Sequence, residues 1–144
     1  IKPLISSFDD VKIEIDKIIE KAFIMADEKQ IRQACSNLIK NSYENITLNK
    51  IPEGNISICF GIENDFASIK ISDNGTGIDK SIISKILEPY YTTKVGNSGL
   101  GLAITKKIID DHNGIILIKP LKSPKGMSVT LKFPLISKLK KEKK

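Results

Sequence analysis

Residues 66–77 read FASIKISDNGTG, an apolar segment that runs directly into a loop of small and polar residues. Residues 66–71 predict a strand, and Asp73, Gly75 and Gly77 then follow at every second position. Asn and Gly tolerate backbone conformations with positive φ, so the chain can turn sharply after the strand. The stretch therefore places a carboxylate and a tight turn at the end of a strand.

The rest of the chain predicts one α+β domain, because helices and strands are mixed rather than strictly alternating. No internal repeat or Ser/Pro-rich linker divides it. Asn113 and Gly114 form a good C-cap for the last helix, and the last two strands form a hairpin. Further strands are predicted at 11–15, 22–26, 56–62, 115–120 and 127–133, and helices at 27–46, 79–87 and 99–112.

The segment 27–46 has the features of an amphipathic helix. Asp27 can cap its first turn, where Glu28 adds favourable negative charge. Asn37, Asn41 and Glu44 share one face beside the apolar stripe, at the boundary between core and surface. The stripe recurs at helical spacing and consists of Ile31, Ala34, Cys35, Leu38, Ile39, Ser42 and Ile46.

Composition excludes several classes of protein. The 144 residues are 40% hydrophobic and 28% charged, ordinary values for a globular domain. Cys35 and Cys59 are too few for a disulfide framework or a zinc site, which favours a reducing compartment. The net charge is +6, but the last seven residues, KLKKEKK, hold five Lys and one Glu and so contribute +4 of it. With 6% aromatic residues and no Trp, we expect no nucleic-acid binding.

Three segments carry groups that could bind a ligand, and each is ambiguous alone. The amide oxygens of Asn37 and Asn41 could ligate Mg²⁺, but solvated or capping asparagines would give the same pattern. Asp73 could accept a hydrogen bond from the exocyclic amine of adenine. Guanine has a carbonyl group at that position, so the carboxylate would select ATP over GTP. Many ordinary turns, however, also read Asp-Asn-Gly.

The third segment, residues 94–102, reads KVGNSGLGL and leads into a predicted helix. The free N–H groups and the dipole of a helix N-terminus suit phosphate, and Lys94 could add a mobile positive charge. The segment is not a P-loop, because it lacks the Gly-Lys-Ser/Thr order at its end. It is not a dinucleotide fingerprint either, because no strand directly precedes it.

Together the segments resemble the ATP-binding catalytic domain of sensor histidine kinases, a Bergerat-type fold. The resemblance runs from about residue 11 to residue 134, and residues 106–114, KKIIDDHNG, with a short lid, are most similar to the nitrogen-regulation subgroup. The N box is NLIKNS at 37–42, the G1 box DNGTGI at 73–78, the F box EPYYTTK at 88–94 and the G2 box SGLGLAI at 98–104.

This resemblance implies an α/β sandwich in which helices cover one face of a mixed, mostly antiparallel sheet. It implies ATP and Mg²⁺ as cofactors, with Asn41 as the metal ligand, Asn37 supporting the phosphates and Asp73 binding the adenine amine. Residues 88–98 would form a mobile lid. The implied binding residues are Asn37, Asn41, Asp73, Gly75, Gly77, Thr93, Lys94, Ser98, Gly99, Leu100, Gly101 and Leu102; no residue is assigned as catalytic.

Two positions depart from related patterns in informative ways. Gyrase-like and chaperone-like ATPases have a general-base Glu four residues before the metal-binding Asn, where this chain has Asn37. An amide cannot take that proton, which favours a protein histidine kinase. A degenerate, binding-only kinase module and a chaperone- or gyrase-type ATPase are the alternatives. In the lid, Asn97 replaces the first G2 glycine, and Gly96 lies one position earlier.

The resemblance also implies partners and boundaries. His112 is the single histidine and is expected to cap a helix or make a surface contact, so the phospho-acceptor His would lie on a separate dimerisation domain of the same protein. A response regulator would be the second partner. We expect a monomeric isolated domain, a homodimeric full-length protein, and a cytoplasmic location within an inner-membrane sensor. The expected domain is 11–135, with a helix remnant at 1–10 and a Lys-rich tail at 136–144. Glu44 could reach Mg²⁺ or be solvated.

Overall fold

The computed structural model describes residues 11–16, 23–88, 101–122 and 125–136. Its single five-stranded sheet has the order β1-β2-β3-β5-β4. β1 pairs with β2 in parallel, and the other neighbouring strands pair antiparallel. The predicted mixed, mostly antiparallel sheet is therefore confirmed. The strands are β1 (Lys12–Ile15), β2 (Asn55–Glu63), β3 (Phe66–Asp73), β4 (Ile115–Lys122) and β5 (Lys125–Pro134).

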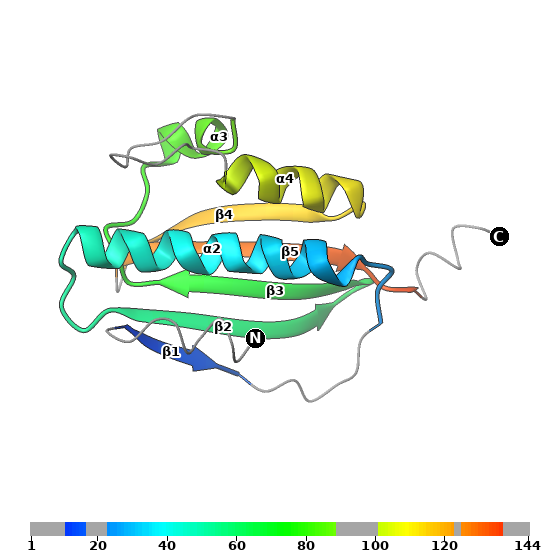
Figure 1. Cartoon of the computed structure of the whole chain (residues 1–144), viewed down its shortest axis with the longest axis horizontal. Coiled ribbons are helices and arrows are strands. Elements are labelled where there is room, and N and C mark those ends of the chain that lie inside the picture. Colours follow the sequence, from blue (N-terminus) through cyan, green and yellow to red (C-terminus); the bar gives the residue numbers. More distant parts are fainter. Residues whose placement is uncertain (1–10, 17–22, 89–100, 123–124, 137–144) are drawn as a thin grey trace.

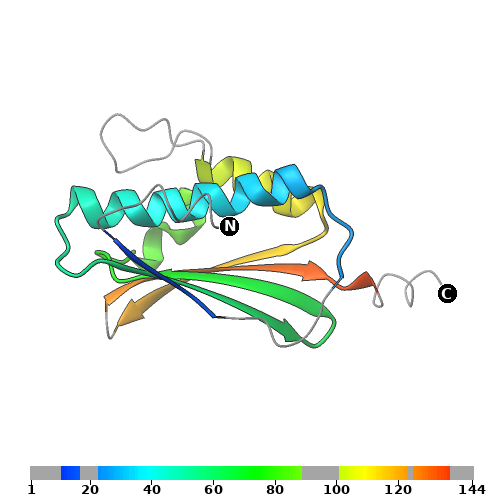
Figure 2. The same cartoon turned by 60° about the horizontal axis from the view of Figure 1, so that its bottom comes forward.

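Helices cover one face of this sheet, as predicted (Figures 1 and 2). The long helix α2 (Glu28–Leu48) crosses the middle of the sheet, and α4 (Gly101–Asp111) lies beside it. The short predicted helix near residue 80 is a 3₁₀ turn, η1 (Lys80–Ile82), continued by one α-helical turn, α3 (Ile83–Ile86). No helix of the described residues is long and apolar enough to cross a membrane.

The start of α2 is set by its own sequence, as predicted. The Oδ1 atom of Asp27 accepts hydrogen bonds from the N–H groups of Lys29 at 3.0 Å and Gln30 at 3.3 Å. These bonds satisfy two of the donors that a helix N-terminus leaves without intrahelical partners. At the other end the N–H of Ile51 reaches back to the carbonyl of Ile46 at 3.0 Å, and the helix ends two residues later than predicted.

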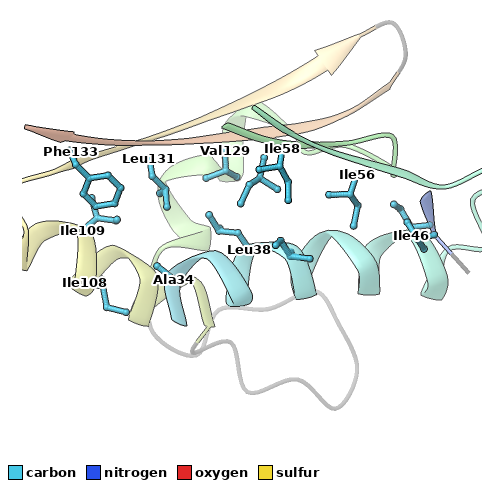
Figure 3. Packing of buried hydrophobic residues seen from close by; sticks show 13 residues of the cluster. Ala34, Leu38, Ile46, Ile56, Ile58, Ile108, Ile109, Val129, Leu131 and Phe133 are labelled. Atoms are coloured by element: carbon cyan, nitrogen blue, oxygen red, sulfur yellow. The ribbon is translucent and has the colours of Figure 1, made fainter. Parts of the chain in front are cut away.

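The core lies between the helices and the sheet (Figure 3). Ala34, Leu38 and Ile46 of α2 point toward the sheet, and residues of β2 and β5 point back toward them. Alternation along the strands and the helical stripe therefore meet in one apolar layer. The fully or nearly fully buried sheet residues include Ile56, Ile58, Ile71, Val129, Leu131 and Phe133.

His112 joins the end of α4 to the start of α2. One ring nitrogen, Nδ1, lies 2.7 Å from the carbonyl oxygen of Ile108, and the other, Nε2, accepts the N–H of Asp27 at 3.0 Å. Because Nε2 accepts, Nδ1 carries the proton and donates it to the helix carbonyl. The expected capping role of His112 is confirmed, and the ring adds a link between two helices. Asn113, with φ 57°, then ends α4 in the predicted place.

The prediction of a strand at 22–26 is wrong, because residues 23–26, the part of it that the structure describes, form no strand. Only Ile24 pairs, in an isolated antiparallel bridge with Leu135, and Phe23 contributes a single carbonyl to the N–H of Ile136 at 2.9 Å. The chain must turn away at once to reach the cap of α2 at Asp27. The side chains of Phe23 and Met25 remain exposed. Residue 22 and the predicted start of the last helix at 99 lie outside the described residues.

Candidate functional site

The two predicted asparagines of α2 face the first residue of α4. The Nδ2 group of Asn37 donates to the carbonyl oxygen of Gly101 at 3.2 Å, and the hydroxyl of buried Thr105 donates to the same oxygen at 3.0 Å. A Cβ atom added to Gly101 would lie 4.0 Å from Nδ2 of Asn41, an ordinary contact. The N-box and G2-box segments, more than sixty positions apart, therefore meet where α4 begins.

Asp73 is the last residue of β3, and its side chain is buried, with 6% of its surface exposed. Its Oδ2 atom accepts the hydroxyl of Ser42 at 2.9 Å, and its Oδ1 atom accepts the backbone N–H of Gly75 at 3.0 Å. A buried carboxylate needs such donors to offset the loss of water. Two donors use only part of the acceptor capacity of a carboxylate, so Asp73 can accept further hydrogen bonds.

Asn74 ties the following turn to the start of β2. Its Oδ1 atom accepts the N–H of Asn55 at 2.7 Å, and its Nδ2 group donates to the carbonyl of Glu53 at 3.0 Å. The backbone N–H of Asn74 also donates to the carbonyl of Asn55 at 3.2 Å. The side chain therefore extends the pairing of β2 and β3 by one step and fixes the direction in which the turn leaves the sheet.

Asn45 holds the far side of the same turn from α2. Its Oδ1 atom accepts the N–H of Thr76 at 2.9 Å, and its Nδ2 group donates to the hydroxyl of Thr76 at 3.1 Å. A Cβ atom added to Gly75 would lie 2.0 Å from Oδ1 of Asn45. A side chain at position 75 would therefore require the Asn45 side chain to move from its place beside the turn.

Glycine is needed at two other positions around Asp73, for backbone reasons. Gly77 has φ +81°, a conformation that L side chains rarely adopt. A Cβ atom on Gly126 of β5 would lie 1.8 Å from the carbonyl oxygen of Asp73 and 3.1 Å from the Cα atom of Asn74. Gly126 therefore lets β5 pass close against the backbone at the end of β3, where Asp73 lies.

Of the predicted binding residues, the described ones fall into two groups along α2. Asn37, Asn41 and Gly101 meet at the start of α4, and Asp73, Gly75 and Gly77 form the turn after β3. Leu102 is partly buried against the core. The remaining predicted residues lie outside the described part of the chain: Thr93, Lys94, Ser98, Gly99 and Leu100.

Neither carboxylates nor thiols cluster here as a metal centre. Within the described residues no group of three or more His, Cys, Asp or Glu side chains could hold a metal ion. The Oε1 atom of Glu44 lies 4.0 Å from Nζ of Lys40, one helical turn earlier. Burial raises the pKa of the Cys35 thiol to about 11, and burial followed by the Asp16 contact raises that of Cys59. Both cysteines are therefore neutral thiols at neutral pH.

Three residues of this arrangement were not predicted from the sequence. Ser42 was placed in the apolar stripe and Asn45 was not singled out, yet both bind the turn after β3. Their spacing of three residues on one helix face is a signal that could have found them. Gly126 directly precedes the strand predicted at 127–133 and lies inside the observed β5. A glycine inside a strand often marks a close backbone approach.

Comparison with known proteins identifies relatives over most of the chain. Residues 26–137 match the model of the histidine kinase-, DNA gyrase B- and HSP90-like ATPases. A candidate NtrY-like sensor histidine kinase of Rickettsia conorii is 34% identical over 88% of this chain and 21% of its own length. Sporulation kinase B of Bacillus subtilis is 38% identical over 77% of this chain and 25% of its own length. The chain therefore spans a quarter or less of these relatives.

Solved structures share the same arrangement of elements. The catalytic domain of the histidine kinase ThkA matches with a TM-score of 0.72 and 28% identity, covering 92% of this chain and 83% of that one. The mycobacterial sensor histidine kinase MprB matches with a TM-score of 0.80 and 20% identity, covering 93% of this chain and 90% of that one. The second likeness supports the fold alone. With the family match over most of its length, this chain belongs to the histidine kinase-, DNA gyrase B- and HSP90-like ATPases.

Proposed function

We propose that the chain binds Mg-ATP between the turn after β3 and the start of α4. The observation that carries this proposal is the buried carboxylate of Asp73, which already has one donor on each oxygen and retains acceptor capacity. An exocyclic amine such as that of adenine can donate to it. A carbonyl oxygen at the same position, as in guanine, would face a carboxylate and be repelled.

We assign the phosphate end of ATP to the polar face of α2 and the beginning of α4. Asn41 would offer its amide oxygen to Mg²⁺, an ion that takes oxygen ligands and keeps several waters. Asn37 would support the phosphates through its position against Gly101. Bound Mg²⁺ would neutralise phosphate charge. Lys94 and the backbone of residues 99–102 would also bind the triphosphate, and Thr93 and Ser98 are the other predicted ATP-binding residues.

For the reaction, we propose transfer of the γ-phosphoryl group to a His nitrogen on a separate dimerisation domain of the same protein. Asn37 stands where a hydrolytic relative would need a general base, and an amide cannot accept a proton at neutral pH. This chain would therefore hold and orient ATP, and phosphoryl transfer depends mainly on positioning and charge. The relatives named as sensor histidine kinases support this assignment. We take residues 11–135 as the domain and expect it to be monomeric by itself and cytoplasmic. A response regulator would accept the phosphoryl group from the phosphohistidine in a second step.

Calorimetric titration tests the nucleotide site directly. The chain is titrated with a non-hydrolysable ATP analogue and the matching GTP analogue, each with and without Mg²⁺. We expect binding that prefers adenine and strengthens with Mg²⁺. Asp73→Asn replaces one acceptor oxygen by a donor and should weaken ATP binding at least tenfold, at about 1.4 kcal/mol per factor of ten. Equal binding of both analogues by a folded sample would contradict the proposed base site.

A second experiment tests transfer separately from binding. A candidate acceptor domain is mixed with the chain and ATP labelled at the γ-phosphate, and acid-labile phosphohistidine is measured. Label on the acceptor supports the kinase assignment. Tight ATP binding without labelling of any cognate acceptor domain would instead support a binding-only module.

A further inference from the structure

We propose that Ser42 is a positioning residue that sets the preference of this site for 6-aminopurine nucleotides. Its hydroxyl holds the Asp73 carboxylate in one orientation from the helix that also carries Asn37 and Asn41. This inference rests on the proposed nucleotide function. It adds a residue that makes no direct contact with the base and acts through Asp73.

The direction of the hydrogen bond between Ser42 and Asp73 follows from the chemistry of the two groups. An ionised carboxylate only accepts, so the hydroxyl of Ser42 must donate its proton to Oδ2 across the 2.9 Å separation. Both side chains are buried, with 4% of Ser42 and 6% of Asp73 exposed. Water therefore cannot readily replace the hydroxyl, and the bond is stronger than it would be at the surface.

The second donor fixes the plane of the carboxylate. The N–H of Gly75 reaches Oδ1 at 3.0 Å while Ser42 reaches Oδ2, so each oxygen is held from a different direction. Rotating the carboxylate about its Cβ–Cγ bond would lengthen both hydrogen bonds together. The remaining lone pairs of Asp73 therefore point in fixed directions, and a ligand amine must approach along them. A purine without that amine gains nothing from this alignment.

Asn45 attaches the turn after β3 to α2 at a second point. It lies three residues after Ser42, on the same helix face, and binds both the N–H and the hydroxyl of Thr76. The turn that begins at Asp73 is thus attached to α2 at both ends. The base end and the phosphate end of the proposed site are then carried by one helix, which fixes the distance between them.

An alternative is that the hydroxyl of Ser42 only stabilises the fold by satisfying a buried carboxylate. The two roles differ in what they change. A purely structural role would alter unfolding and would weaken all nucleotides alike. A positioning role would weaken only those nucleotides whose base donates to Asp73.

The experiment compares ATP with purine riboside triphosphate, which has hydrogen in place of the amine at position 6. Affinities for both are measured for the unchanged chain, for Ser42→Ala and for Ser36→Ala, with Mg²⁺ present. Ser36→Ala makes the same change of helix propensity on the same helix and serves as the matched control. We expect Ser42→Ala to weaken ATP binding about tenfold and to weaken binding of purine riboside triphosphate less than twofold. Ser36→Ala should change neither affinity.

A near-isosteric variant covers the case in which Ser42→Ala does not fold, as judged by circular dichroism. Ser42→Cys keeps a weak donor, and we expect it to retain an intermediate preference for ATP. An unchanged preference in a folded Ser42 variant, or an equal loss for both nucleotides, would overturn the positioning role while leaving the nucleotide site intact. Absence of all nucleotide binding in the unchanged chain would instead overturn the proposed function and, with it, this inference.

Discussion

The two halves of the proposed site are built in different ways. At the base end, five side-chain hydrogen bonds connect Asp73 and Thr76 to α2 or to the turn itself. At the phosphate end, Asn37 of α2 meets α4 through the backbone carbonyl of Gly101. The base end therefore depends on local contacts around one carboxylate. The phosphate end depends on how two helices lie relative to each other.

This difference assigns distinct roles to residues outside the site. Gly126 lets β5 approach Asp73 and so affects the base end. His112 links the end of α4 to the start of α2, at the opposite end of α4 from Gly101, and we expect it to affect the phosphate end through the placement of α4. A change at Gly126 should alter the preference between nucleotides. A change at His112 should alter the affinity for all nucleotides and leave the preference unchanged.

The largest expected effect is from Gly126→Ala, which breaks the base end. The added Cβ would lie 1.8 Å from the backbone oxygen of Asp73, so β5 or β3 must move. We expect a loss of about 3 kcal/mol in the free energy of unfolding, typical of overpacking against backbone, together with a reduced preference for ATP over purine riboside triphosphate. Urea denaturation and nucleotide titration measure the two effects.

Gly61→Ala is the matched control for Gly126→Ala. It also adds one methyl group to a strand glycine, but the nearest atom is the Ser68 hydroxyl oxygen at 3.3 Å. We expect a change below about 1 kcal/mol, because a surface strand position tolerates a small side chain. Equal destabilisation by the two variants would contradict the importance of the close approach at Gly126.

The next largest effect is from His112→Ala, which loosens the phosphate end. The change removes both ring hydrogen bonds and the edge contact with Phe133, whose ring centroid lies 6.4 Å away. We expect a loss of about 2 kcal/mol in unfolding free energy and weaker binding of both purine nucleotides, with their ratio unchanged. Asp111→Ala removes only an exposed ion pair with Lys107 and should cost less than about 0.5 kcal/mol. A changed ratio in His112→Ala would show that the two halves are not separable.

Combining Gly75→Ala with Asn45→Ala tests the packing of the turn at the base end. Gly75→Ala should destabilise the chain because its Cβ meets Oδ1 of Asn45 at 2.0 Å. In an Asn45→Ala background that obstacle is gone, and we expect the cost of Gly75→Ala to fall by about 1 kcal/mol. Gly77→Ala should show no such rescue, because its strain comes from φ +81°. Additive costs for Gly75 and Asn45 in denaturation would contradict this packing.

The smallest expected effect is from Thr105→Val, at the phosphate end. The substitution removes one of the two donors to the carbonyl of Gly101 and leaves that of Asn37. Because the carbonyl keeps a partner, we expect a loss of only about 0.5 kcal/mol in unfolding free energy. Thr130→Val, the same change on β5, is the comparison in thermal unfolding. A cost above about 2 kcal/mol for Thr105→Val would mean that Asn37 does not compensate.

Features set by neighbouring residues could be predicted well. Asp27 caps α2, and Asn113 ends α4, because a cap needs only the few residues around it. The sheet strands after residue 55 were placed within a few residues for the same reason. The strand predicted at 22–26 failed because apolar composition alone does not supply a pairing partner. Ile24 finds one only at Leu135, more than a hundred positions away.

The sequence by itself determined the order of helices and strands, the polar face of α2 and the turn residues after β3. These follow from periodicity and from the conformational preferences of single residues. Only the tertiary structure decided that Ser42 of the core stripe binds Asp73, that Gly126 approaches the backbone of Asp73 closely, and that His112 links two helices. Periodicity states which face of an element a residue occupies. Which atom it meets there depends on packing between segments that are distant in the chain.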